Sequence, residues 1–161
     1  MEWFKNAIIQ ATKSMDVIAR VLFLLIMLLV VGNVIFRLFG RPFDGSYEWV
    51  GFMMGTAISF SLAYCALREG HVSIGILVER LGGTIQQTAW LLEKLLSLFF
   101  LALTVRMIIL YGNRMLESGH VGMNTGVPLY YFAYIIAFGF LVYCLVLIYN
   151  LVDGAEKMIK R

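Results

Sequence analysis

Four long apolar runs alternate with short polar segments along this chain. The runs cover about residues 17–36, 49–67, 89–111 and 128–152, and none carries an acid or a histidine near its centre. An α-helix rises ~1.5 Å per residue, so each run is long enough to cross the ~30 Å hydrocarbon core of a bilayer. The pattern predicts an all-α integral membrane protein with four transmembrane helices, forming a single membrane domain over residues 1–161.

Two flanking segments are amphipathic. In residues 2–16 and the start of the first run, apolar side chains recur at spacings of four and three, which places them on one helical stripe. This stripe comprises Phe4, Ile8, Ala11, Met15, Ile18 and Leu22. The segment is either a helix on the inner membrane surface or a simple extension of the first span. Residues 70–87 are too polar to cross, and we expect an interfacial helix there that breaks at Gly82-Gly83.

The positions of the basic residues predict the orientation. If the N-terminus is cytoplasmic, the inner segments hold Lys5, Lys13, Arg20, Arg68, Arg80, Lys94, Lys157, Lys160 and Arg161. The outer side then holds only Arg37, Arg41, Arg106 and Arg114. Cytoplasmic loops are enriched in Lys and Arg, so we expect both termini to be cytoplasmic. The modest net charge of +3 fits lipid headgroups better than nucleic acid.

Small residues form a stripe along the second span. Gly51, Gly55, Ser59 and Ala63 recur every four residues and would let another helix backbone approach closely. We therefore predict a packing surface here, assigned to subunit packing, although the pattern leaves open whether the partner helix belongs to this chain or to another.

Arg106 is the charge that lies deepest inside a predicted span. A buried arginine needs a partner or a route to the headgroups. Glu48, at the outer start of the second span, is the natural partner, and Asn33 is a further contributor. We predict a structural contact of Arg106 with Glu48 or with a partner subunit.

The sequence contains no recognisable catalytic arrangement. It shows no nucleophile beside a base, no phosphate-binding loop and no paired carboxylates, so we expect no enzyme activity and no cofactor. His71 and His120 fall on opposite sides of the membrane, which argues against a haem held between them. Cys65 and Cys144 lie within apolar runs and are expected to be packing residues without a disulfide.

Several short motifs occur in a recognisable order. Arg37 ends the first span, Tyr47-Glu48-Trp49 opens the second, Arg68-Glu69-Gly70-His71 follows it, and Val127-Pro128 precedes the fourth. This order resembles the small membrane subunit of the tripartite ATP-independent periplasmic (TRAP) transporters, the DctQ-like family. In one departure, many members carry two acids before the second span, whereas Glu48 is followed here by Trp49. A role for the second acid is therefore not transferred.

The resemblance implies a partner set and a function. It implies an accessory scaffold subunit in the bacterial inner membrane that joins a large membrane subunit, where sodium and substrate bind, and works with a periplasmic solute-binding protein. The transported substrate would be an organic anion of the carboxylate or sialic acid type. Structural polar contacts are expected at Arg37, Glu48, Arg68, His71 and Arg106. Docking of the binding protein is expected at Arg41, Asp44, Arg114 and Glu117.

Two other classes of protein compete with this interpretation. A membrane anchor of a redox complex would carry haem or quinone. A small homodimeric multidrug exporter needs a membrane-buried carboxylate, which none of the four runs offers near its centre.

Overall fold

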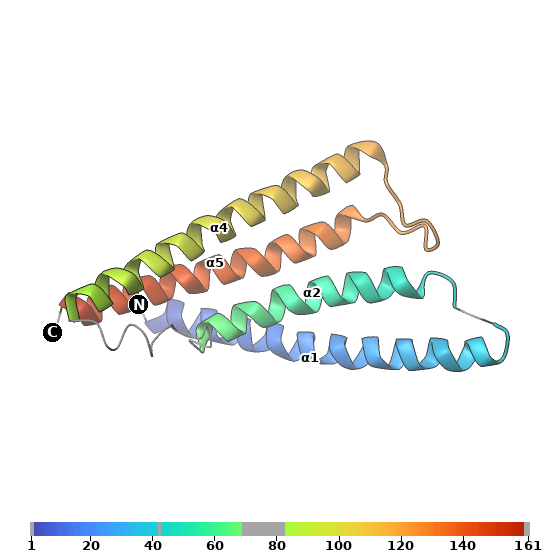
Figure 1. Cartoon of the computed structure of the whole chain (residues 1–161), viewed down its shortest axis with the longest axis horizontal. Coiled ribbons are helices and arrows are strands. Elements are labelled where there is room, and N and C mark those ends of the chain that lie inside the picture. The colour runs from blue at the N-terminus through green and yellow to red at the C-terminus, as the bar shows by residue number, and fades with distance from the viewer. Residues whose placement is uncertain (1, 42, 69–82, 160–161) are drawn as a thin grey trace.

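The computed structural model describes residues 2–41, 43–68 and 83–159 and places four long helices in them. These are α1 (Glu2–Leu38), α2 (Ser46–Leu67), α4 (Gly83–Ser118) and α5 (Tyr130–Ile159) (Figure 1). Each contains a stretch long and apolar enough to cross a membrane, namely Ile8–Leu38, Ser46–Leu67, Leu91–Ser118 and Tyr130–Val152. The predicted fold class, an all-helical protein with four candidate spans, is confirmed.

The helix ends follow local backbone chemistry. Beyond α1, Gly40 adopts a positive φ of 72°, and the Arg41 backbone N–H donates to the Phe36 carbonyl at 3.1 Å. Beyond α4, Gly119 has a φ of 64°, and the His120 N–H donates to the Met115 carbonyl at 3.1 Å. A glycine in the left-handed conformation turns the chain so that the next backbone N–H bonds to a carbonyl that the helix leaves free. Both helices therefore end just before such a glycine.

The two amphipathic segments have different outcomes. Residues 2–16 continue into the first span as part of one unbroken helix, α1. Their place relative to a membrane surface stays a prediction. Most of the second segment, residues 70–82, lies outside the described residues, and residues 83–87 form the start of α4.

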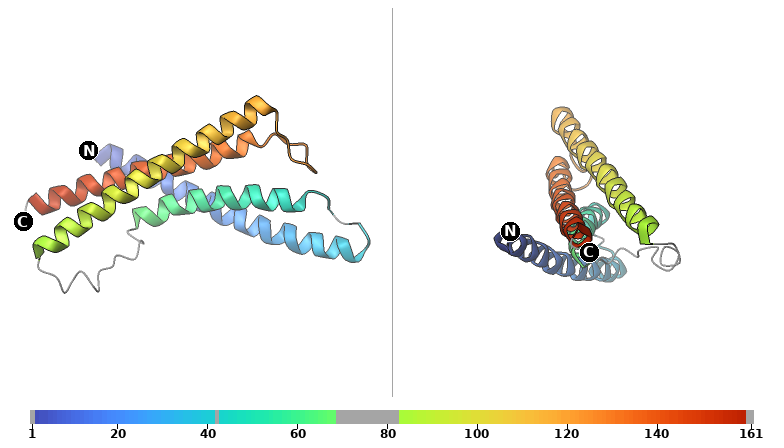
Figure 2. Two further views of the ribbon diagram at one scale, coloured as in Figure 1. Left: turned by 45° about the horizontal axis from the view of Figure 1, so that its top comes forward. Right: turned by 90° about the vertical axis from the view of Figure 1, so that its left-hand side faces the viewer.

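The helices form an open row. α1 packs against α2, α2 against α5, and α5 against α4, while contact between α1 and α5 is slight. Among the described helices, α4 touches neither α1 nor α2, so the four do not close into a square bundle. Figure 2 shows the row from two further sides. Both termini lie at one end of the molecule, and the α1–α2 and α4–α5 loops lie at the other (Figure 1).

Two buried apolar clusters form where α1, α2 and α5 meet. One buried cluster contains Met15, Ala19, Ala57 and Phe60, and a second contains Ile8, Ala66 and Val146. The first part of α1 is thus packed within the chain. Its buried face is rotated from the predicted stripe, because Thr12 is buried whereas Ala11 and Ile18 are exposed.

Candidate functional site

The small-residue stripe of α2 packs largely inside the chain. A Cβ on Gly55 would lie 2.8 Å from Ile136 Cδ1, and Ser59 and Ala63 are 0% exposed. From the α5 side, a Cβ on Gly139 would lie 2.6 Å from Ser59 Oγ. The predicted packing surface thus has an internal partner at Gly55 and Ser59, which contact α5, and Ala63 is buried within the chain, so these three residues are not free to pack against another subunit. Gly51 is exposed with open space above its Cα, so it remains available to another subunit.

At the loop end, the Glu48 carboxylate joins α2 to the α4–α5 loop. Oε1 accepts a hydrogen bond from the Asn124 backbone N–H at 3.0 Å. Oε2 accepts bonds from the Thr125 backbone N–H at 3.2 Å and the Thr125 hydroxyl at 2.6 Å. Successive backbone N–H groups in a turn form a concave site for an anion. This loop binds the Glu48 carboxylate in that way.

Glycines shape the turn that receives Glu48. The Gly126 N–H donates to the Gly122 carbonyl, and the Gly122 N–H donates to the Val127 carbonyl, both at 2.9 Å. A Cβ on Gly122 would overlap the Glu48 carboxylate and the Thr125 hydroxyl. The close approach thus requires glycine at position 122. We call Glu48 together with residues 122–126 the outer clamp.

Arg106 does not take part in the outer clamp. The two ion pairs of the described residues are Asp16–Arg20 and Glu93–Lys94, and Arg106 lies on the exposed side of α4. The predicted Glu48–Arg106 pair is therefore wrong, because the loop backbone occupies the carboxylate. The alternative, a partner subunit, stays open.

Asn33 braces the α1–α2 connection instead of meeting Arg106. Its Nδ2 donates to Ser46 Oγ at 2.9 Å, and its Oδ1 accepts from the Phe43 backbone N–H at 3.0 Å. The first bond joins the end of α1 to the start of α2, and the second joins it to the loop between them. This amide fixes the first hairpin just beside the outer clamp.

Aromatic rings continue the contact below the outer clamp. Phe52 of α2 stacks on Phe132 of α5 with ring centroids 4.0 Å apart, and Trp49 meets both rings edge-on. On the other side of α5, the Tyr134 hydroxyl donates to Asn113 Oδ1 of α4 at 2.7 Å. The loop ends of α2, α5 and α4 are therefore joined by both polar and aromatic contacts.

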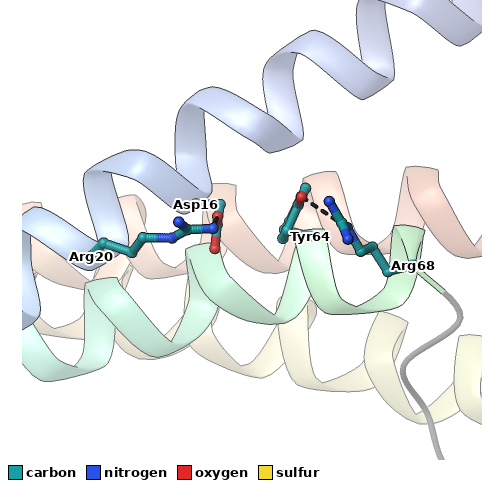
Figure 3. A network of polar contacts seen from close by, with 4 residues as sticks. All are labelled: Asp16, Arg20, Tyr64 and Arg68. Carbon is teal, nitrogen blue, oxygen red and sulfur yellow. Dashed lines mark hydrogen bonds and ion pairs between the residues drawn. The ribbon is translucent and has the colours of Figure 1, made fainter.

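At the opposite end, an amide joins α5 to α2. Asn150 Nδ2 donates to the Ala66 backbone carbonyl at 2.9 Å, and we call this contact the inner clamp. Figure 3 shows two further polar contacts: Arg68 donates to the Tyr64 hydroxyl at 2.9 Å, and Asp16 pairs with Arg20 on α1. The guanidinium of Arg68 also lies 5.2 Å from the Tyr64 ring centroid. Arg68 thus has a structural contact within its own helix.

The remaining predicted residues are exposed or undescribed. Arg37 is exposed in the last turn of α1, and His71 lies outside the described residues. The residues predicted to dock the binding protein are all exposed at the loop end, namely Arg41, Asp44, Arg114 and Glu117. Cys65 and Cys144 are both free, as expected.

The buried polar side chains of the described residues are satisfied within the chain. Within the part of the chain that the structure describes, every buried side-chain nitrogen or oxygen has a hydrogen-bond partner. In the same part, no three His, Cys, Asp or Glu residues gather closely enough to hold a metal ion. The site is a set of helix contacts and outer surfaces, which can bind other helices and lipid.

Sequence reasoning missed the loop half of the outer clamp and the whole inner clamp. Every residue except proline carries a backbone N–H, so the donors of the outer clamp cannot be recognised from the residue types. The pair Gly122 and Gly126 does indicate a tight turn in this loop. Asn150 did leave a signal. It is a lone amide in an otherwise apolar run, and such a group needs a partner in the membrane.

Four apolar helices in an open row, joined by clamps at both ends, define a small polytopic membrane protein organised for helix packing. The model of the family described as "Tripartite ATP-independent periplasmic transporters, DctQ component" matches residues 26–157. The chain belongs to this family, the small membrane component of TRAP transporters, and the predicted resemblance is confirmed. Neither the curated proteins nor the solved structures gave a match to this chain.

Proposed function

We propose that this chain is the scaffold subunit that braces the large membrane subunit of a sodium-coupled TRAP transporter. The transporter would import an organic anion of the carboxylate or sialic acid type, delivered by a periplasmic solute-binding protein. The chain would lie in the bacterial inner membrane with both termini cytoplasmic. Membership of the DctQ family supports the role as a transporter component, and the excess of basic residues at the terminal end supports the orientation.

One observation carries the scaffold role. The α1–α2 hairpin and the α4–α5 hairpin are bonded to each other near both ends of their helices. The outer clamp fastens them at the loop end and the inner clamp at the terminal end. Between the clamps, α2 and α5 pack through small residues at very short distances. Such a unit resists internal motion, which is what a brace for a moving partner requires.

The outer faces of the row are suited to contact with lipid and a partner. The large apolar side chains exposed on α1 include Val21, Leu24, Met27, Leu28, Val31 and Phe36. Those on α4 include Leu92, Leu96, Phe99, Phe100, Leu103 and Met107. Because α1 and α4 are the edge helices, either face can extend the scaffold sideways in the membrane.

Purification from the native membrane tests this proposal. A tagged chain, extracted in mild detergent, should bring a much larger polytopic protein at a fixed ratio and show no Soret band. In proteoliposomes with the binding protein, the pair should take up the anion when an inward sodium gradient is imposed. Uptake should be lost when the small chain is left out. A chain that purifies alone, or with a redox subunit and haem, would overturn the proposal.

The loop end is the proposed docking surface for the binding protein. Arg41 and Asp44 lie in the first loop, and Arg114 and Glu117 lie in the last turns of α4. All four are exposed and share the end of the molecule opposite the termini (Figure 1). This placement supports the docking proposal because a periplasmic partner reaches only the outer side.

A further inference from the structure

Arg106 lies on a face of α4 that the other described residues leave open. The buried or half-buried residues of α4 that face α5 recur at spacings of three and four, and they comprise Leu98, Leu101, Val105, Ile108 and Gly112. A Cβ on Gly112 would lie 3.2 Å from Tyr134, which places this face against α5. With ~100° per residue, Arg106 lies about 120° away from the centre of that face. Its nearest neighbours along the helix surface, three and four residues away, are all exposed: Ala102, Leu103, Ile109 and Leu110.

The depth of Arg106 follows from the contact between α4 and α5. The Tyr134–Asn113 hydrogen bond puts Asn113 level with the tyrosines that begin α5, and such aromatics mark the membrane interface. Arg106 lies seven residues, about 10 Å, further into the membrane than Asn113. It therefore lies within the span Leu91–Ser118, well below the tyrosines.

The direction of α4 hinders the escape of this charge to the headgroups. The Cα–Cβ bonds of an α-helix tilt toward its N-terminus. α4 runs from the terminal end to the loop end (Figure 1), so the Arg106 side chain leans away from the nearer interface and toward the bilayer centre. Snorkelling to the outer headgroups would work against this lean. An ionised group at that depth needs an anionic or strongly polar partner.

The part of the chain that the structure describes shows no ion pair of Arg106. Glu48 is held by the outer clamp, and Asp16 pairs with Arg20. Glu93 and Glu117 lie thirteen and eleven residues away along α4, and Asp44 lies in the α1–α2 loop at the end of the molecule. A second copy related by a two-fold axis along the membrane normal would bring Arg106 against Arg106. The pair would repel, so a homodimer through this face does not satisfy the charge.

We propose that Arg106 anchors the interface with the large membrane subunit. The face formed by Ala102, Leu103, Arg106 and Leu110 would bind a membrane helix of that subunit that presents a carboxylate at the same depth. Charge complementarity favours this partner. One cation on an apolar helix face is best stabilised by one anion on the apolar face of a neighbouring membrane helix. The proposal rests on the proposed function and identifies the surface that performs it.

The test compares two situations for the same variants. The chain is expressed together with its own large subunit and binding protein, and also alone. In the complex, Arg106→Leu should lower the amount of large subunit retained on the tagged chain at least tenfold, and Arg106→Lys should retain most of it. Arg37→Leu is the matched control, because it removes one arginine from an exposed helix end, and retention should not change. Expressed alone, Arg106→Leu should reach the wild-type membrane level or exceed it, since it removes an unpaired charge from the bilayer.

The outcomes separate this proposal from the function on which it rests. If the wild-type chain retains no large subunit, the proposed function fails. If wild type and Arg106→Leu retain it equally, only the anchor is refuted. A variant that keeps the large subunit but loses co-purifying anionic phospholipid would show that a lipid headgroup holds Arg106, which also overturns the proposal. A low membrane level of Arg106→Leu expressed alone would assign the arginine a role inside this chain and would overturn it as well.

Discussion

The close approach of α5 to α2 at Gly139 gives the sharpest stability prediction for this protein. Gly139 of α5 faces Ser59 of α2, and an added Cβ would lie 2.6 Å from Ser59 Oγ, 2.8 Å from Ser59 Cβ and 2.9 Å from Phe60 Cδ1. Optimal carbon contacts lie at about 3.5–4.0 Å. In Gly139→Ala, the two helices must therefore separate by roughly 0.7–1 Å near the middle of the membrane.

The size of the effect follows from the contacts that such a separation weakens. A gap of about 0.5–1 Å forfeits a quarter to a half of the dispersion energy of each contact, and overpacking of this kind costs about 1–3 kcal/mol. Alanine also favours the helix over glycine by up to about 1 kcal/mol. The matched control Gly51→Ala gains the same helical preference, yet its Cβ meets no atom within 4 Å. The difference between the two variants isolates the packing term.

The assay is the free energy of unfolding of the purified chain in bilayer-like detergent, for both single variants and for a rescue variant. Gly139→Ala should be less stable than Gly51→Ala by about 1–3 kcal/mol. Ser59→Gly removes the atoms that meet the new Cβ at 2.6 and 2.8 Å. The double variant Ser59→Gly/Gly139→Ala should therefore recover part of the loss, as a positive coupling in a double-mutant cycle. Equal stability of Gly139→Ala and Gly51→Ala would refute the reasoning.

Three further predictions concern the two clamps and the loop end. Glu48→Ala removes the acceptor for the Asn124 and Thr125 N–H groups, so hydrogen exchange at these two amides should become faster while α2 stays protected. Unchanged exchange would show that the loop keeps its fold without the carboxylate. Asn150→Leu leaves the Ala66 carbonyl without this donor and should lower the free energy of unfolding by about 0.5–1.5 kcal/mol. An unchanged free energy of unfolding would show that the inner clamp does not stabilise the fold. Arg41→Glu and Glu117→Arg should slow uptake at low binding-protein concentration but not at saturation, with Lys13→Glu at the terminal end as control; an unaltered concentration dependence would remove the loop end from docking.

The spans could be predicted from the sequence because the physics that sets them is local. A run of about twenty apolar residues has one low-energy solution in a bilayer, so 49–67 falls close to Ser46–Leu67 in the structure. The helix ends beyond the runs were less visible. α1 begins at Glu2 and α4 extends to Ser118, because the polar residues that flank an apolar run can extend its helix beyond the hydrocarbon core.

The pairing of polar groups could not be predicted in the same way, and Glu48 shows why. Charge and depth suggested Arg106 as its partner, yet two backbone N–H groups of a loop seventy-six and seventy-seven residues away compete for the same oxygens. A turn donates fixed N–H groups without losing side-chain entropy, whereas an arginine must order its long side chain. The packing stripe was visible as a pattern, but its partner helix depended on the order of the row, which periodicity does not contain.

The positions of the clamps explain how the α2–α5 pair can be stiff with few polar contacts. Glu48 and Ala66 are eighteen residues apart, so the two clamps are separated by ~27 Å along α2. The tight contact at Ser59 and Gly139 lies near the midpoint. A tilt of about 5° around that midpoint would move each end by about 1.2 Å. At the end where the helices separate, this movement takes a hydrogen bond of 2.9 Å beyond the range of ~3.2 Å in which such bonds hold. A tilt of this size in either direction therefore breaks the clamp at one end, while direct approach is blocked by the contact in the middle. Because the clamps lie far from the midpoint, two weak contacts at the ends resist rotation of α2 against α5. This property supports the proposed role as a brace beside a moving subunit.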